Sequence, residues 1–180
     1  PRIMPRTLHW FKWESALTWI SGMFLLIIVY YMGGLMLESG SEMSELTASL
    51  IGMGVLIFGY GAYHLLWNSP LGTNEIVASI ISFILIIALF VGLDLLFSSR
   101  AAMMHIGAVF GTIMTANVWM TILPAQRKMI ASVKNNEPPD MSLAIRAKRC
   151  SKHNTYMSVP LIVIMISSHF PVTTYGNTYN

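Results

Sequence analysis

The sequence has few charged residues and only one cysteine. Of its 180 residues 11% are charged, against roughly 25% in a soluble domain, and the mean hydropathy is +0.60. This composition excludes a water-soluble globule. The single Cys150 excludes an internal disulfide, a thiolate-bound iron–sulfur cluster and a Cys-x-x-Cys-His haem attachment within these residues, so histidines must hold any redox cofactor.

Charge of either sign is scarce outside short segments. Eleven Lys and Arg against eight Asp and Glu give a formal net charge of +3. Because most of the basic residues lie in two short segments, the excess indicates orientation in a membrane and no nucleic-acid partner. A signal peptide is also lacking, since the chain opens on Pro1 with no charged segment, short apolar core and cleavage site. We therefore expect a fragment of a longer chain, or a divergent relative of one.

Long apolar runs are what the sequence does contain. A helix needs about 20 apolar residues to cross a hydrocarbon core about 30 Å thick. Five runs approach or exceed this length: residues 15–37, 47–67, 76–97, 101–123 and 154–170. The last run is the shortest and stops at Pro171. The sequence therefore predicts an all-α integral membrane protein, with residues 1–180 forming one transmembrane domain of about five helices.

The charges predict which way this bundle crosses the bilayer. Basic residues precede the first run and glutamates fill the first connection, which places the amino end in the cytoplasm. The residues concerned are Arg2, Arg6 and Lys12, then Glu38, Glu42 and Glu45. Four crossings return the connection 124–153 to the cytoplasm, where the most basic stretch of the chain is expected, and the fifth crossing follows it. Asp140 is a candidate helix N-cap within it. The carboxyl end is then periplasmic.

Ionisable side chains in apolar runs are costly, so each is a candidate functional residue. The expected topology sorts them into two layers: Asp94, His105 and His169 near the outer end, and His9, His64 and His153 near the inner end. Two histidines at one depth on different helices suit the axial positions of a b-type haem, which makes His105 and His169 candidate haem-iron ligands. The alternatives are that each histidine hydrogen-bonds a backbone carbonyl beside glycines that serve helix packing, or belongs to a proton relay or substrate site.

Two further patterns predict contacts between helices. Glu14, Thr18, Ser21 and Gly22 fall on one face of the first run, and a polar stripe in a membrane must face protein or a cavity, so it predicts a neighbouring helix. Asn117 in the fourth run is interpreted as an interhelical hydrogen-bonding residue and not as a ligand.

Several long motifs resemble those of a known family. They are Leu-His-Trp-Phe-Lys-Trp-Glu at 8–14, the run from Met104 to Trp119 followed by Ile-Leu-Pro-Ala-Gln-Arg-Lys at 122–128, Ser-Lys-His-Asn-Thr-Tyr at 151–156 and Ser-Ser-His-Phe-Pro at 167–171. In this order the chain resembles the membrane domain of the bacterial membrane-bound urate hydroxylases, also called the urate oxidase N-terminal domain. The motifs contain every histidine except His64, which we interpret as structural.

The resemblance implies an enzyme of the bacterial inner membrane that oxidises urate to 5-hydroxyisourate and passes electrons to a cytochrome c domain or protein. For this reaction Asp94, His153 and His9 are the candidate catalytic residues, as groups that move protons. The usual Cys-x-x-Cys-His motif is missing here. One alternative is therefore a non-catalytic transmembrane subunit of a larger respiratory or photosynthetic complex. A second is a small transporter or channel, for which Asp94, His64 and Asn117 are the candidate residues.

Overall fold

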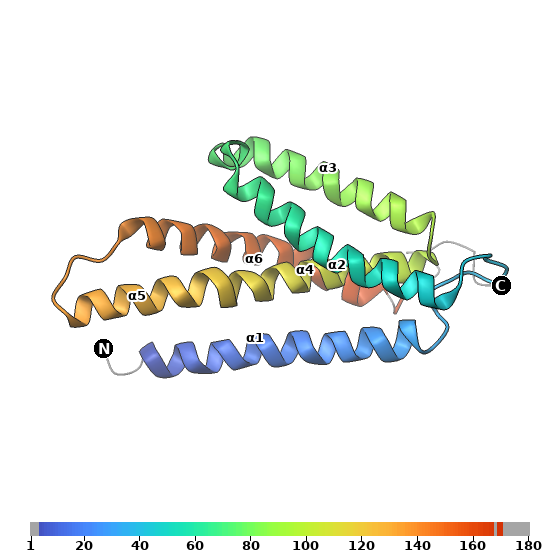
Figure 1. Ribbon diagram of the computed structural model, residues 1–180, viewed down its shortest axis with the longest axis horizontal. Helices are drawn as coiled ribbons and strands as arrows, with labels where there is room; N and C mark the ends of the chain where they lie inside the picture. Colours follow the sequence, from blue (N-terminus) through green and yellow to red (C-terminus); the bar gives the residue numbers. More distant parts are fainter. Residues whose placement is uncertain (1–3, 168, 171–180) are drawn as a thin grey trace.

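The computed structural model describes residues 4–167 and 169–170, and these form five continuous helices that run back and forth along one axis (Figure 1). Their bounds are α1 Met4–Leu26 with the π-helix Ile27–Tyr31, α2 Glu45–Asn68, α3 Glu75–Asp94, α4 Ser99–Ala116 with the π-helix Asn117–Ile122 and α5 Leu123–Lys134, and α6 Met141–Ser167. A 3-10 turn, Pro70–Thr73, joins α2 to α3. The described residues contain no strand, which confirms the all-α prediction.

Four of the helices are long and apolar enough to cross a membrane: Thr7–Tyr31, Glu45–Asn68, Glu75–Asp94 and Ser99–Lys134. α6 is not one of them over the residues described, because its first half carries a cluster of basic side chains. The predicted fifth run, 154–170, overlaps its second half, so a fifth crossing stays a prediction. Arg2 and Pro171, on which the predicted orientation and the end of that run partly depend, lie outside the described residues.

The first helix begins and ends earlier than the predicted run 15–37. Charged residues interrupt an apolar run without interrupting a helix, so α1 continues back past Glu14 to Met4. Its end is set by two glycines. A Cβ on Gly33 would lie 2.3 Å from the carbonyl oxygen of Val29, and Gly34 has φ +67°, a conformation that glycine adopts without strain.

The fourth helix continues beyond the predicted run 101–123 and through Pro124. The π-helix Asn117–Ile122 precedes this proline and shifts the hydrogen-bond register. Pro124 therefore lies in the first turn of α5, where a backbone N–H needs no partner within the helix, so the N–H that proline lacks leaves no hydrogen bond unmade. Much of the expected loop 124–153 is therefore helical, and residues 135–140 alone lie between α5 and α6. The carboxylate of Asp140 accepts from the Ser142 N–H at 2.9 Å, which confirms the N-cap.

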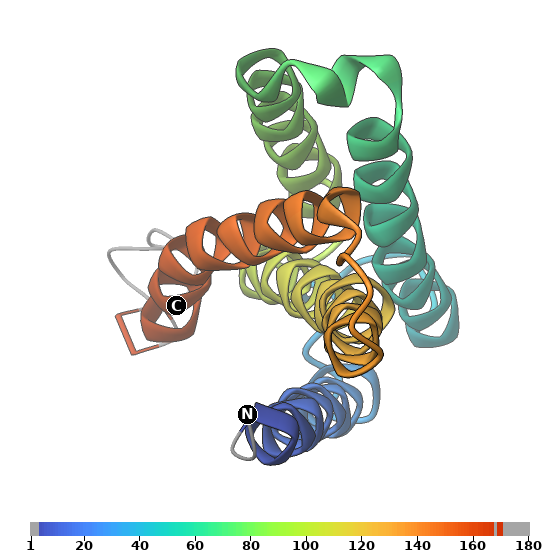
Figure 2. The same cartoon turned by 90° about the vertical axis from the view of Figure 1, so that its left-hand side faces the viewer.

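The core of the bundle surrounds α4, which contacts α1, α2, α3 and α6 and lies between them in the end view of Figure 2. Glycines allow these helices to approach closely. A Cβ on Gly59 of α2 would lie 2.6 Å from Val109 of α4, and one on Gly107 of α4 would lie 3.1 Å from Ile164 of α6. Gly59 and Gly107 thus contribute to close packing of helices, whereas a Cβ on Gly61 or Gly111 would have no atom within 4 Å.

The alternating helices give the bundle two ends. The start of α1 and the α5–α6 connection lie at one end, which we call the amino end, and the connections after α1 and α3 lie at the opposite end (Figure 1). The ionisable residues of the two predicted layers lie toward opposite ends of this bundle, and their depth in a membrane stays a prediction. The predicted neighbour of the α1 polar stripe is not found within the described chain. Thr18 and Ser21 are exposed, their hydroxyls bond carbonyls of α1 itself, and Gly22 has no atom in reach of a Cβ.

Candidate functional site: two buried tyrosine–histidine pairs

A tyrosine–histidine pair joins α2 to α6 near the amino end. The Tyr63 hydroxyl and Nδ1 of His153 lie 2.8 Å apart, and the rings of Trp67 and His153 have centroids 4.0 Å apart. His153 and Trp67 are both buried. We call these three residues with Asn117 and Asn154 the His153 cluster. Polar groups from three helices thus meet between spans, where an unpaired group would be costly.

Two asparagines complete this cluster at the start of the π-helix Asn117–Ile122. The side-chain amide of the buried Asn117 donates to the Tyr63 hydroxyl and to Oδ1 of Asn154, each at 3.0 Å. Asn154 in turn donates to the carbonyl of Met114 at 3.0 Å. The prediction that Asn117 is an interhelical hydrogen-bonding residue is confirmed. π-Helical turns occur frequently at functional sites, and this one places Asn117 toward α2 and α6 at once.

The hydrogen bonds favour one tautomer of His153. Because Asn117 already donates to the Tyr63 oxygen, the Tyr63 hydroxyl is free to donate to Nδ1, which leaves the His153 proton on Nε2. Arg149 is held nearby by a 3.1 Å bond to the Trp67 carbonyl. With Nδ1 accepting a hydrogen bond and one proton on Nε2, His153 is neutral in this arrangement.

The second pair lies near the opposite end, between α1 and α4. His105 is completely buried, and its Nε2 lies 3.0 Å from the Tyr31 hydroxyl. Its Nδ1 lies 2.7 Å from the carbonyl oxygen of Ala101, which can only accept. Nδ1 therefore carries the proton and Nε2 accepts from Tyr31, the reverse of the tautomer at His153.

These contacts do not fit an axial haem ligand at His105. Both ring nitrogens are bonded within the chain, and Gly52 of α2 packs so closely that a Cβ there would lie 2.6 Å from Nε2. A macrocycle on Nε2 would have to displace Tyr31 and α2. His169, the expected second ligand, is exposed beyond the end of α6, and no described contact joins it to His105. Haem binding by these two residues stays a prediction.

The other expected site residues lie away from both pairs. Asp94 is the last residue of α3 and is exposed. His9 is exposed near the start of α1, where its ring centroid lies 6.4 Å from that of Trp13. His64 is exposed on α2 beside Tyr60. Of the expected catalytic residues, His153 alone thus lies in a buried polar cluster of the described chain.

A comparison with protein families covers the whole chain. The family model described as urate oxidase N-terminal matches residues 1–180. The chain belongs to the urate oxidase N-terminal family. No curated protein and no solved structure gives a significant match. Both tyrosine–histidine pairs of this urate oxidase N-terminal chain lie within the matched residues.

Sequence reasoning missed the partners of the two histidines in this urate oxidase N-terminal chain. Tyr31 and Tyr63 each lie on a different helix from the histidine they contact, and tyrosine is common at membrane interfaces for other reasons. Asn154 was counted as the first residue of an apolar run. One signal was available, because Tyr63 and Trp67 are four residues apart and share a helical face.

Proposed function

We propose that this chain is the membrane part of a urate-oxidising enzyme of the urate hydroxylase type, in the bacterial inner membrane. The family match over residues 1–180 supports the substrate class, and four helices able to cross a bilayer support the location. We further propose five crossings, with α6 as the fifth, a cytoplasmic amino end and a periplasmic carboxyl end. Basic residues flank the amino end of the bundle and glutamates fill the connection after α1, which supports this orientation.

The proposed reaction is a two-electron oxidation. Urate and water give 5-hydroxyisourate, two protons and two electrons, and one new C–O bond forms at C5. The electrons reduce two ferric cytochrome c haems, one electron each, on a domain or partner protein. The membrane chain must therefore bind an anion, admit one water and carry two protons away from the reacting carbon.

The His153 cluster is the observation that carries this proposal. A buried polar network between membrane helices is costly and marks a substrate or proton pathway by default. Its histidine accepts a hydrogen bond from a tyrosine hydroxyl, which supports a role for this pair in handling protons. We propose this pair as the proton-handling groups nearest the substrate. Asp94 and His9, exposed at opposite ends, are proposed as proton exits.

Urate consumption in membranes tests the proposal. Vesicles that contain the complete protein are given urate and ferricytochrome c, and both urate loss and cytochrome reduction are followed. We expect two cytochromes reduced per urate, loss of both signals in His153→Ala, and full activity in His64→Ala, whose exposed ring lies outside the cluster. No urate consumption by the complete wild-type protein, with no binding of urate, would overturn the proposal.

The α1 polar stripe favours a second candidate, a non-catalytic subunit of a larger electron-transfer complex. Thr18 and Ser21 are exposed on a helix that is able to cross a membrane, and Gly22 leaves open space beside them. A second helix from another subunit would satisfy this face. Purification in mild detergent discriminates the two candidates: fixed stoichiometry with other subunits supports this one, and a lone active enzyme contradicts it.

A further inference from the structure

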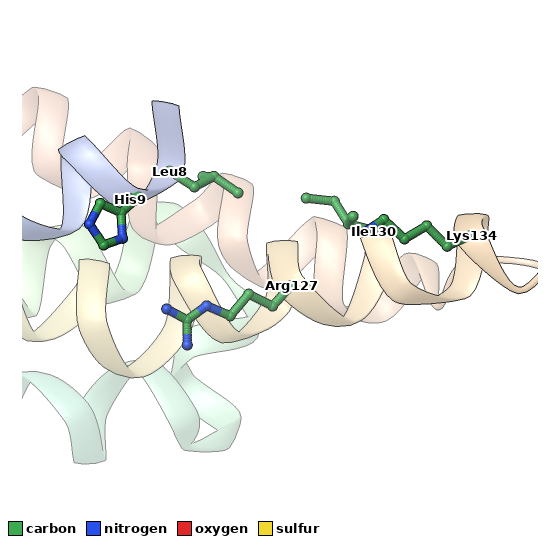
Figure 3. A pocket seen from close by; sticks show the side chains of 5 residues that line it. All are labelled: Leu8, His9, Arg127, Ile130 and Lys134. Carbon is green, nitrogen blue, oxygen red and sulfur yellow. The ribbon is translucent and has the colours of Figure 1, made fainter. Parts of the chain in front are cut away.

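A basic cavity of about 200 Å³ opens between α1 and α5. Leu8 and His9 line it from α1, and Arg127, Ile130 and Lys134 line it from α5. In Figure 3 the guanidinium of Arg127 extends along α5 beneath His9, and the side chain of Lys134 extends back toward Ile130. Arg127 and Lys134, which are two helical turns apart on α5, thus line the same cavity.

An aromatic group one turn deeper marks the edge of the bilayer beside this cavity. Trp13 of α1 and Trp119 of the π-helix pack edge to face with ring centroids 6.3 Å apart, and Nζ of Lys12 lies 4.5 Å from the Trp119 ring centroid. Tryptophans of membrane helices gather at the headgroup boundary. His9 precedes Trp13 by one turn, about 5 Å, so the cavity lies at the depth of the lipid phosphates.

The cations of the cavity have no carboxylate to neutralise them. No acidic residue lines it. Within the part of the chain that the structure describes, the one ion pair joins Lys152 to Glu75, so neither Arg127 nor Lys134 is paired. Basic pockets between membrane helices are suited to the phosphate of a lipid headgroup. The neighbouring surface of α1 suits acyl chains, since Trp10 is 68% exposed and Leu17 60% exposed.

We propose that this cavity binds the phosphate of an anionic phospholipid. Arg127 and Lys134 contact the phosphate oxygens, while Leu8 and Ile130 contact the glycerol and the first acyl carbons. Bound there, the lipid bridges α1 and α5, which line the cavity from two sides without an ion pair between them in the described residues. This binding is independent of the proposed reaction and does not require urate turnover.

Native mass spectrometry of the purified protein tests the site. The protein is equilibrated in mixed micelles with equal amounts of phosphatidylglycerol and phosphatidylcholine, and the retained lipids are counted. We expect wild type to retain phosphatidylglycerol preferentially and the Arg127→Gln/Lys134→Gln variant to lose that preference, by about fivefold for each cation removed. Lys134→Gln alone, an exposed change at the end of α5, gives the effect of one cation if the double variant does not fold.

A control with the same loss of charge separates the cavity from general electrostatics. Lys128 and Lys148 are exposed and do not line the cavity, so Lys128→Gln/Lys148→Gln should keep the wild-type preference. Equal losses in the two double variants, or no loss in either, would overturn the proposal. Displacement of the retained lipid by urate would overturn it too, because the cavity would then be a substrate site.

Discussion

The Tyr63 hydroxyl and Nδ1 of His153 lie 2.8 Å apart, although 90 positions separate the two residues in the chain. The contact ties the end of α2 to α6, a helix that is not one of the four candidate spans. Asn117 joins the same contact from the fourth helix. Three helices are therefore held in register at this depth by one small network.

Tyr63→Phe should destabilise the protein by about 1–3 kcal/mol, because it leaves Nδ1 of His153 and the Asn117 amide without this partner in a buried site. Thermal unfolding in detergent measures the change. Tyr60→Phe is the matched control, since the Tyr60 hydroxyl makes an exposed contact with the sulfur of Met120. Equal shifts in the two variants would show that the buried network contributes nothing specific.

Gly52→Ala should be destabilising, by about 1–3 kcal/mol, because the new Cβ would lie 2.6 Å from Nε2 of His105 and 2.8 Å from the Tyr31 hydroxyl. The pair is buried between helices and has little room to shift. Gly54→Ala is the control, since no atom lies within 4 Å of its Cβ, and alanine there should be neutral or stabilising by up to about 1 kcal/mol. Thermal unfolding of both variants decides between them.

The two interpretations of His105 predict different haem contents. The expected bis-histidine site predicts that His105→Ala and His169→Ala each abolish haem binding. The observed contacts, with both ring nitrogens of His105 bonded within the chain, predict that His105→Ala leaves the haem content per chain unchanged. A pyridine-haemochrome spectrum on samples of known mass measures this. Haem in wild type that is absent from both variants would show that Tyr31 releases Nε2.

The bodies of the helices could be predicted from the sequence, and their ends could not. The run 47–67 lies inside Glu45–Asn68, because hydropathy reports burial in lipid. Helix ends depend on local geometry instead. Gly34 ends the first helix through a positive φ, and Pro124 fails to end the fourth because a π-helix precedes it. The lengths of the apolar runs do not show that the first helix ends near Gly34 or that the fourth helix continues through Pro124.

The candidate site was predictable in part for a similar reason. His105 and His153 were identified because an ionisable group in or beside an apolar run carries a cost that must be met. The hydrogen-bond partners that offset this cost depend on how α1, α2 and α6 pack against α4, and side-chain fit across the bundle decides this packing. The tyrosine partners of the two histidines could therefore not be predicted from the sequence. The clustering of His153 with Asn117 was equally hidden.

The central position of α4 has a consequence for biosynthesis. Synthesis proceeds from the amino end, so α1, α2 and α3 are made before Ser99. Each of the three helices packs on α4, so the surfaces that they share with α4 have no partner until α4 is inserted. A nascent chain halted before Ser99 should expose the faces that α4 later covers, and the quality-control proteases of the membrane should degrade it.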